Sequence, residues 1–153
     1  MANGILLSQN TAIMLERARR KGFTDEQLLN IIRTEDSSEL IRINEEWFTY
    51  DDFLSYAKEH GELLEQAVLE GYRITFNTMN GLKIWLQERF GVEEGTDFSR
   101  GEGQYNGLKL SDANLDALKS TLAANWTVIE EEAAIGSERT VTLAVRAFVG
   151  QQA

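Results

Sequence analysis

Apolar residues recur at intervals of three and four along the first part of the chain, which is the spacing of one face of an α-helix. This pattern predicts a helical hairpin over residues 11–33. Ser8 or Asn10 can cap its first helix, and Thr24 with Gln27 has the capping-box spacing at the start of its second helix.

The middle of the chain continues with shorter helical patterns. Thr49 and Asp52 have the spacing of a cap that leads a helix over 50–60, and a stripe of apolar residues predicts a second helix over 63–70. Before them, residues 40–43 alternate in polarity, so we expect a short strand there.

Strand patterns enter in the second half of the chain. Residues 72–76 alternate apolar and polar side chains and predict a strand, after which Asn77 can cap a helix over 78–90. Residues 93–106 combine five charged residues with several of the twelve glycines and show little periodicity. We expect this stretch to be a surface loop.

The last part of the chain carries the strongest strand signal. Ser111 can cap a final helix of leucines spaced three and four apart, and two strands over 126–132 and 140–149 then form a β-hairpin. In the second strand every other residue is apolar, which is typical of a sheet with one buried face.

These elements predict one α+β domain over residues 1–153. Its parts are a helical hairpin over 1–34, an acidic helical segment over 35–72, and a strand-helix-loop-helix-hairpin region over 73–153. We expect a small, mainly antiparallel sheet, made of 72–76 and the C-terminal hairpin and covered by four or five helices.

The composition excludes several kinds of chemistry. The chain of 153 residues has no Cys, so disulfides, thiolate metal sites and Cys nucleophiles are excluded, which suits the reducing cytoplasm. No run of apolar residues is long enough to cross a membrane or to act as a signal peptide. The one histidine, His60, lies at a predicted helix end and has no second histidine at the helical spacing of a zinc site.

Catalysis would therefore depend on carboxylates, with Glu93, Glu94 and Asp97 beside the glycine-rich loop as the alternative site of a metal enzyme. No phosphate-binding glycine motif supports a nucleotide cofactor. We expect no enzyme activity, no metal and no cofactor.

Direct nucleic-acid binding is also disfavoured. The first two helices resemble a helix–turn–helix in outline, but the second helix begins with Asp25 and Glu26, where a DNA-reading helix needs basic or amide side chains. The net charge of −10 opposes contact with phosphate groups.

The negative charge is concentrated in one segment. Residues 35–72 hold eleven acidic and two basic residues, a net charge of −9, interleaved with aromatic residues. Acidic groups can steer a basic partner to an interface where aromatic rings anchor it. The predicted partner-binding residues are Glu39, Glu45, Glu46, Trp47, Tyr50, Asp51, Asp52, Tyr56, Glu59 and Glu62.

Three functions are compatible with these features. The first is a non-enzymatic inhibitor, immunity or regulatory protein that covers a basic surface of a partner macromolecule, such as a nucleic-acid-handling protein. Immunity proteins against nuclease toxins and phage-encoded blockers of DNA-handling enzymes share this acidic profile. The second is the carboxylate-dependent metal enzyme. The third is an assembly subunit that pairs with a second copy through the C-terminal hairpin, for which the strand over 140–149 offers an edge.

Overall fold

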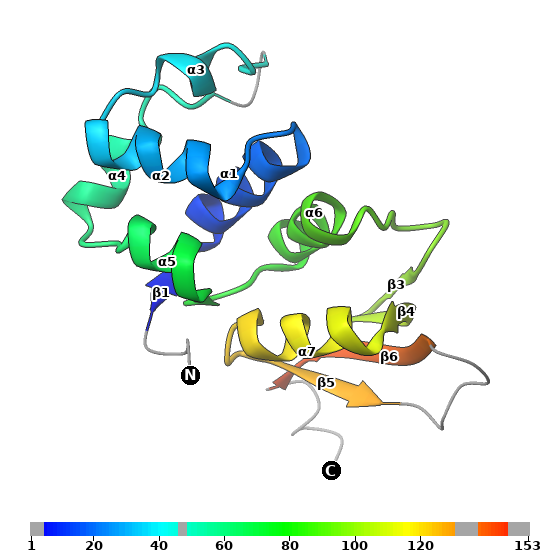
Figure 1. Cartoon of the computed structure of the whole chain (residues 1–153). Helices are drawn as coiled ribbons and strands as arrows, with labels where there is room; N and C mark the ends of the chain where they lie inside the picture. The colour runs from blue at the N-terminus through cyan, green and yellow to red at the C-terminus, as the bar shows by residue number, and fades with distance from the viewer. Residues whose placement is uncertain (1–4, 46–48, 131–137, 147–153) are drawn as a thin grey trace.

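A mostly helical first half of the chain precedes a strand-rich second half (Figure 1). The computed structural model describes residues 5–45, 49–130 and 138–146. In these residues the helices are α1 (Gln9–Arg20), α2 (Asp25–Thr34), α3 (Ser38–Ile41), α4 (Phe53–Glu59), α5 (Leu64–Glu70), α6 (Met79–Phe90) and α7 (Asp112–Thr121). The strands are β1 (Leu6–Leu7), β2 (Arg73–Ile74), β3 (Ser99–Gly101), β4 (Gln104–Ser111), β5 (Trp126–Glu130) and β6 (Glu138–Val145). The predicted α+β class is confirmed.

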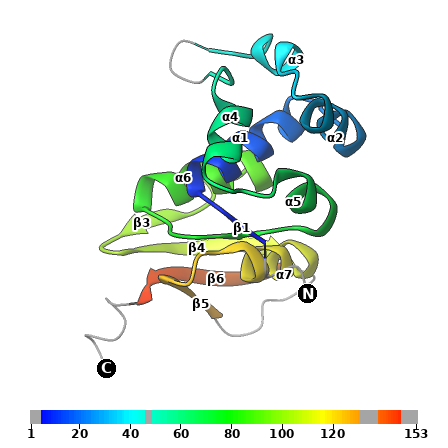
Figure 2. The same cartoon turned by 90° about the vertical axis from the view of Figure 1, so that its left-hand side faces the viewer.

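The larger sheet has four antiparallel strands in the order β3-β4-β6-β5. It contains the predicted C-terminal hairpin, β5 with β6. Helix α7 connects β4 to β5 and lies on one face of the sheet, while β6 fills the place between those two strands (Figures 1 and 2). Leu108 of β4, Leu118 of α7 and Leu143 of β6 are completely buried.

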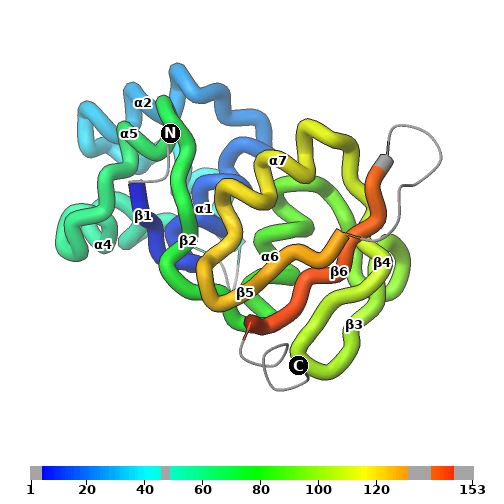
Figure 3. Tube along the Cα trace, turned by 90° about the horizontal axis from the view of Figure 1, so that it is seen from below, coloured from blue at the N-terminus to red at the C-terminus, as the bar shows by residue number. Residues whose placement is uncertain are grey.

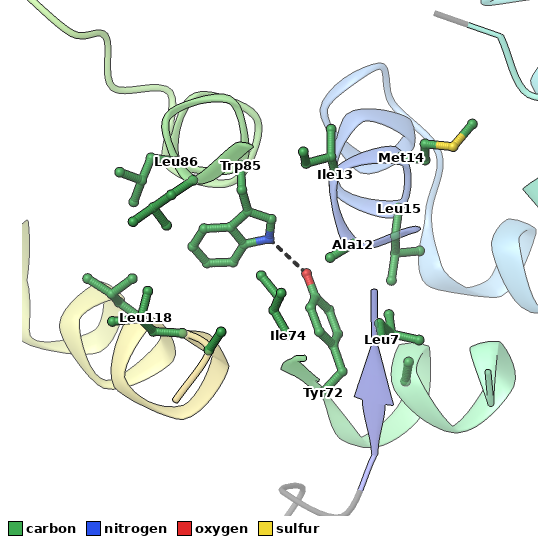
Figure 4. Close-up of a cluster of buried hydrophobic side chains, with 14 of the residues drawn as sticks. Leu7, Ala12, Ile13, Met14, Leu15, Tyr72, Ile74, Trp85, Leu86 and Leu118 are labelled. Atoms are coloured by element: carbon green, nitrogen blue, oxygen red, sulfur yellow. Dashed lines mark hydrogen bonds between the residues drawn. The ribbon is translucent and has the colours of Figure 1, made fainter. Parts of the chain in front are cut away.

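Helices α1 and α6 pack against each other above β2, and their buried side chains form the centre of the core (Figure 4). Leu15 of α1, Trp85 of α6 and Ile74 of β2 are at most 1% exposed. The indole nitrogen of Trp85 donates a hydrogen bond to the hydroxyl oxygen of Tyr72 over 3.0 Å. Burial of these large apolar groups is the main force that holds the helical part on the sheet.

Three helix starts follow the predicted capping chemistry. Ser8 accepts a hydrogen bond from the main-chain nitrogen of Thr11, and Ser111 caps α7 in the same way. At α2 the capping box is complete, since Thr24 and Gln27 each accept a main-chain N–H of the other, over 3.1 and 2.8 Å. Each cap accepts a hydrogen bond from a main-chain N–H group of the first helical turn, which has no partner within the helix.

Two predicted caps are wrong. The cap predicted at Thr49 and Asp52 does not form, because helix α4 begins at Phe53 and not at residue 50, and Asp52 at its start makes no side-chain cap bond. Helix α6 is capped by Thr78, whose hydroxyl oxygen accepts from the main-chain nitrogen of Gly81, and not by Asn77. Asn77 is buried, and its side chain bonds residues far along the chain.

The predicted strand over 40–43 is also wrong, because these residues belong to the short helix α3 and the turn that follows it. Only Leu40 of this run is completely buried, whereas Ile41 is exposed, and the main-chain bonds are local turn bonds such as Ile43 N to Leu40 O. Four residues are too few for their alternation to distinguish a strand from a helix.

The strand predicted over 72–76 exists as β2, but it does not join the hairpin sheet. It pairs in parallel with β1, with Leu6 opposite Arg73 and Leu7 opposite Ile74 (Figure 3). The pattern indicated a strand correctly, but alternation within a segment carries no information about which strand pairs with it.

The predicted loop over 93–106 contains a β-hairpin. Strands β3 and β4 turn at Glu102 and Gly103, with Gly103 at φ 66°. Glycine adopts such a positive φ without steric cost, as tight hairpin turns require. Phe98, next to β3, and Tyr105 of β4 are buried against each other and hold the hairpin on the core.

Candidate functional site

The structure separates the ten predicted partner-binding residues into four groups. Glu46 and Trp47 lie outside the described residues. Tyr50 is buried, and Glu45 and Glu62 are engaged in contacts within the chain. The remaining five are exposed around α3 and α4: Glu39, Asp51, Asp52, Tyr56 and Glu59.

Tyr50 is a correction to the sequence analysis. Its side chain is 0% exposed, so the ring cannot anchor a partner at the surface. It packs edge-on against Phe53, and its hydroxyl group donates to the main-chain oxygen of Met14 over 2.7 Å. Burial raises the pKa of the Tyr50 hydroxyl above its usual range. Tyr50 therefore belongs to the core that attaches α4 to α1.

Glu62 and Glu45 hold the helical layer together. The Glu62 carboxylate accepts hydrogen bonds from the main-chain nitrogen of Ser8 and from the hydroxyl group of Thr11, at the N-terminal end of α1. A carboxylate at this end satisfies open donors and complements the helix dipole. Glu45 forms ion pairs with Arg17 and Lys21 near the other end of α1.

The carboxylates of Asp51, Asp52 and Glu59 have no hydrogen-bond or ion-pair partner among the described residues. They lie on and before α4. The basic residue of α4, Lys58, is already paired with Glu35 over 3.2 Å. The negative charge at this surface is therefore not neutralised by the described residues, and we call Asp51, Asp52, Tyr56 and Glu59 the α4 acidic face. Glu39 lies apart from it, on α3 and beside α2.

The exposed ring in this face is Tyr56, which is 36% exposed. It stacks on His60, with 4.1 Å between ring centroids and 24° between ring planes. His60 caps α4, as expected from its place before Gly61, and donates from Nδ1 to the main-chain oxygen of Tyr56 over 2.9 Å. This contact restricts the rotation of the Tyr56 side chain and presents a fixed aromatic surface.

A pocket of about 340 Å³ lies beside Tyr56, between α1 and α4. Its walls combine apolar groups, hydroxyl groups, one amide and one carboxylate. The lining residues are Asn10, Thr11, Met14, Thr49, Asp52, Phe53 and Tyr56. No basic side chain lines it, so the carboxylate of Asp52 is the one charged group among these residues.

A second pocket, of about 510 Å³, lies on the other side of α4, toward α5. Leu54, Ala57 and Leu64 contribute apolar surface, and Leu63 is 52% exposed there. The ion pair of Lys58 with Glu35 borders it. Helix α4 therefore lies between the two pockets, and the second is lined by Glu35, Glu62 and Glu65 as well as by Lys58.

The carboxylates of the alternative metal site do not converge. Asp97 accepts a hydrogen bond from the main-chain nitrogen of Glu93 over 2.8 Å, and Glu94 pairs with Arg100 over 3.1 Å. In the part of the chain that the structure describes, no group of three or more His, Asp or Glu side chains could hold a metal ion.

One buried ionic cluster was not found from the sequence. The Glu16 carboxylate, 3% exposed, accepts from Arg19 over 3.0 Å, from Arg89 over 3.4 Å and from the hydroxyl group of Tyr72 over 2.7 Å. In the sequence, Glu16 directly follows the apolar residues of α1, and this position was the sign that its carboxylate could be buried. Both carboxylate oxygens of Glu16 accept a hydrogen bond. The cluster therefore connects α1 with α6 and with Tyr72 next to β2, and it leaves no unpaired, reactive carboxylate.

Two of the three basic residues of α1, Arg17 and Arg19, are also engaged. Arg17 pairs with Glu88 over 3.0 Å and with Glu45, while Arg19 pairs with Glu16 and Asp25. These carboxylates neutralise much of the positive charge that a helix–turn–helix would need to bind phosphate groups.

Over residues 5–45, 49–130 and 138–146, no helix is long and apolar enough to cross a membrane. Comparisons with protein-family models, with curated proteins and with solved structures found no match to this chain.

Proposed function

We propose that this chain is a non-enzymatic, acidic protein-interaction module that acts in the cytoplasm by covering a basic surface of a partner macromolecule. An inhibitor or immunity-type regulator of a nucleic-acid-handling protein fits this role, since such partners carry basic surfaces for phosphate. The partner is a protein, and neither nucleic acid nor a membrane is contacted directly.

One observation carries the proposal. In the α4 acidic face, Asp51, Asp52 and Glu59 lack ion-pair partners among the described residues. The exposed Tyr56 ring, which stacks on His60, lies between them along the chain and lines a pocket with Asp52. Unpaired charges accelerate association with a surface of opposite sign, and a rigid ring loses little entropy when it is buried. The negative charges that attract a basic partner and the aromatic ring that anchors it are thus present on the same side of α4.

The proposal is tested by capture of partners from a lysate of the cells that encode the chain, at about 0.05 M and about 0.5 M salt. We expect basic proteins to be captured at the lower concentration and largely released at the higher one, because salt screens charges at exposed surfaces. The proposal is contradicted if no basic protein is captured, or if the amount captured does not change with the salt concentration.

A second candidate function is assembly with another copy of the chain. Over the described part of the expected edge at residues 140–149, β6 has no free side, because it pairs with β4 on one side and β5 on the other. Residues 147–149 lie outside the described residues. Among the described strands, β5 lies at the outer edge of the hairpin, where Ile129 is 42% exposed. Such an edge can pair with a second strand. Light scattering that gives a strict monomer at high protein concentration would exclude this candidate.

A further inference from the structure

The pocket between α1 and α4 has the composition of a receptor for one cationic side chain. Asp52 supplies a carboxylate with no partner among the described residues, and it makes no cap bond to α4 that a ligand would have to displace. Asn10 donates through Nδ2 to the Met14 sulfur over 3.7 Å, so its carbonyl oxygen can accept a hydrogen bond. The pocket therefore offers a negative charge and hydrogen-bond acceptors to the same ligand.

The apolar part of the pocket suits a flat cation. Met14 and Phe53 are buried in its wall, and the Tyr56 ring borders it while His60 holds that ring by stacking. An arginine guanidinium group is planar, is weakly hydrated, and both stacks on aromatic rings and donates several hydrogen bonds in its plane. A lysine ammonium group is more strongly hydrated and lacks a flat face.

The dipole of α1 is the main electrostatic objection, because Asn10 and Thr11 lie near the positive end of this helix. The Glu62 carboxylate already occupies that end and accepts from Ser8 and Thr11. It offsets the partial positive charge of the helix terminus, so a cation in the pocket meets a local surplus of negative charge.

From these contacts we infer that the pocket between α1 and α4 binds a guanidinium group, the side chain of an arginine on the partner's basic surface. The inference rests on the proposed function and deepens it. The pocket volume of about 340 Å³ lies at the lower end of the range for small-ligand sites, about 300–1,000 Å³, which fits one side chain better than a larger ligand.

The chain supplies a matched pair of variants for the test, Asp52→Asn and Asp51→Asn. Both residues are exposed, neighbouring and without ion-pair partners among the described residues, but only Asp52 lines the pocket. Each substitution removes one negative charge from the same surface, and neither removes a cap bond of α4. A difference in ligand binding between the two variants is therefore caused by the pocket and not by the overall charge.

The probes are N-acetyl-arginine amide and N-acetyl-lysine amide, added to the full chain and followed by amide chemical shifts in NMR spectra. We expect arginine amide to shift the signals of Asn10, Phe53 and Tyr56, and lysine amide to bind more weakly. Asp52→Asn should weaken arginine binding about fivefold, and Asp51→Asn less than about twofold. Shifts that are absent or spread over the surface, or equal effects of the two substitutions, would overturn the inference.

The same variants separate this inference from the proposed function. If a basic protein is captured in a salt-sensitive way and both substitutions weaken its capture equally, the acidic face binds its partner without the pocket, and the inference fails alone. If arginine amide binds at Asp52 but no basic protein is captured, the inference about the ligand holds and the proposed function fails.

Discussion

Tyr50 donates a hydrogen bond to the main-chain oxygen of Met14 over 2.7 Å, and this contact attaches the start of α4 to α1. The two residues are 36 positions apart in the sequence. Phe53, which packs on the Tyr50 ring, and Met14 both line the pocket beside Tyr56. The geometry of the candidate site thus depends on a residue that is itself buried.

Substitution of Tyr50 should therefore act on stability. Tyr50→Phe loses one net hydrogen bond, so we expect a decrease of about 1 kcal/mol in the free energy of unfolding. Tyr50→Ala leaves a cavity and should cost about 3–5 kcal/mol. Urea unfolding followed by tryptophan fluorescence measures both. A Tyr50→Phe variant that unfolds like the wild type but no longer captures its partner would show that the hydroxyl group acts at the surface.

Glu62 and Glu59 are two acidic residues of the same segment with different roles. Glu62→Ala removes the acceptor for Ser8 and Thr11 and should lower the free energy of unfolding by about 1–3 kcal/mol. Glu59→Ala serves as its control, because this exposed side chain has no partner among the described residues, and we expect a change within about 0.5 kcal/mol. Equal losses in thermal or urea unfolding would mean that the Glu62 contacts contribute nothing.

Alkaline pH should weaken the fold through Tyr72. Burial raises the pKa of this hydroxyl well above its usual value of 10.0, and the adjacent Glu16 carboxylate raises it further. The folded chain then holds this proton more tightly than the unfolded chain. Stability is retained below about pH 10 and falls above it, by up to about 1.4 kcal/mol per pH unit for each such tyrosine.

The variant Tyr72→Phe checks this assignment. At neutral pH it should be less stable by about 1–3 kcal/mol, because Glu16 and Trp85 lose a buried partner. Between pH 9 and about 11 its stability should fall less steeply than that of the wild type. If the free energies of unfolding of the wild type and of Tyr72→Phe fall in parallel as the pH rises, the Tyr72 proton does not cause the loss of stability.

Asn77 connects the helical part to the sheet. Its side-chain oxygen accepts from the main-chain nitrogen of Ala123 over 2.9 Å, and its main-chain oxygen accepts from the indole of Trp126 over 3.0 Å. Asn77→Ala leaves the buried Ala123 donor unsatisfied and should cost about 1–3 kcal/mol. Asn114→Ala, at an exposed position of α7, should change the free energy of unfolding by less than about 0.5 kcal/mol. If chemical unfolding shows similar changes in both variants, Asn77 is not a connecting residue.

The features that could be predicted from sequence are those decided by neighbouring residues. The capping box of Thr24 and Gln27 and the cap at Ser111 depend on atoms within three positions, and both are confirmed. The C-terminal hairpin was also predictable, because its alternation extends over many residues.

Several of the failures concern contacts between distant residues. Tyr50 resembles an interface ring in sequence, and only its bond to Met14 shows that it belongs to the core. Strand β2 carries no local sign that it pairs with β1. The hairpin of β3 and β4 is a local feature, and it was missed because its glycine-rich stretch shows little alternation. For the candidate site, sequence indicated the charge around α4 but not the pocket that Asp52 lines.

The central claim is that the α4 acidic face binds a basic partner, and a charge-matched pair of variants tests it most directly. In one, the three carboxylates of the face become amides: Asp51→Asn, Asp52→Asn and Glu59→Gln. In the other, three exposed acidic residues elsewhere, whose carboxylates lack partners among the described residues, are changed in the same way: Glu26→Gln, Glu102→Gln and Asp116→Asn.

Both variants lose the same charge, so any difference between them depends on position. The measurement is the amount of basic partner captured at low salt, relative to the wild type. We predict that capture falls roughly tenfold for the face variant and changes less than about twofold for the control variant. Equal capture by the two variants would contradict the claim.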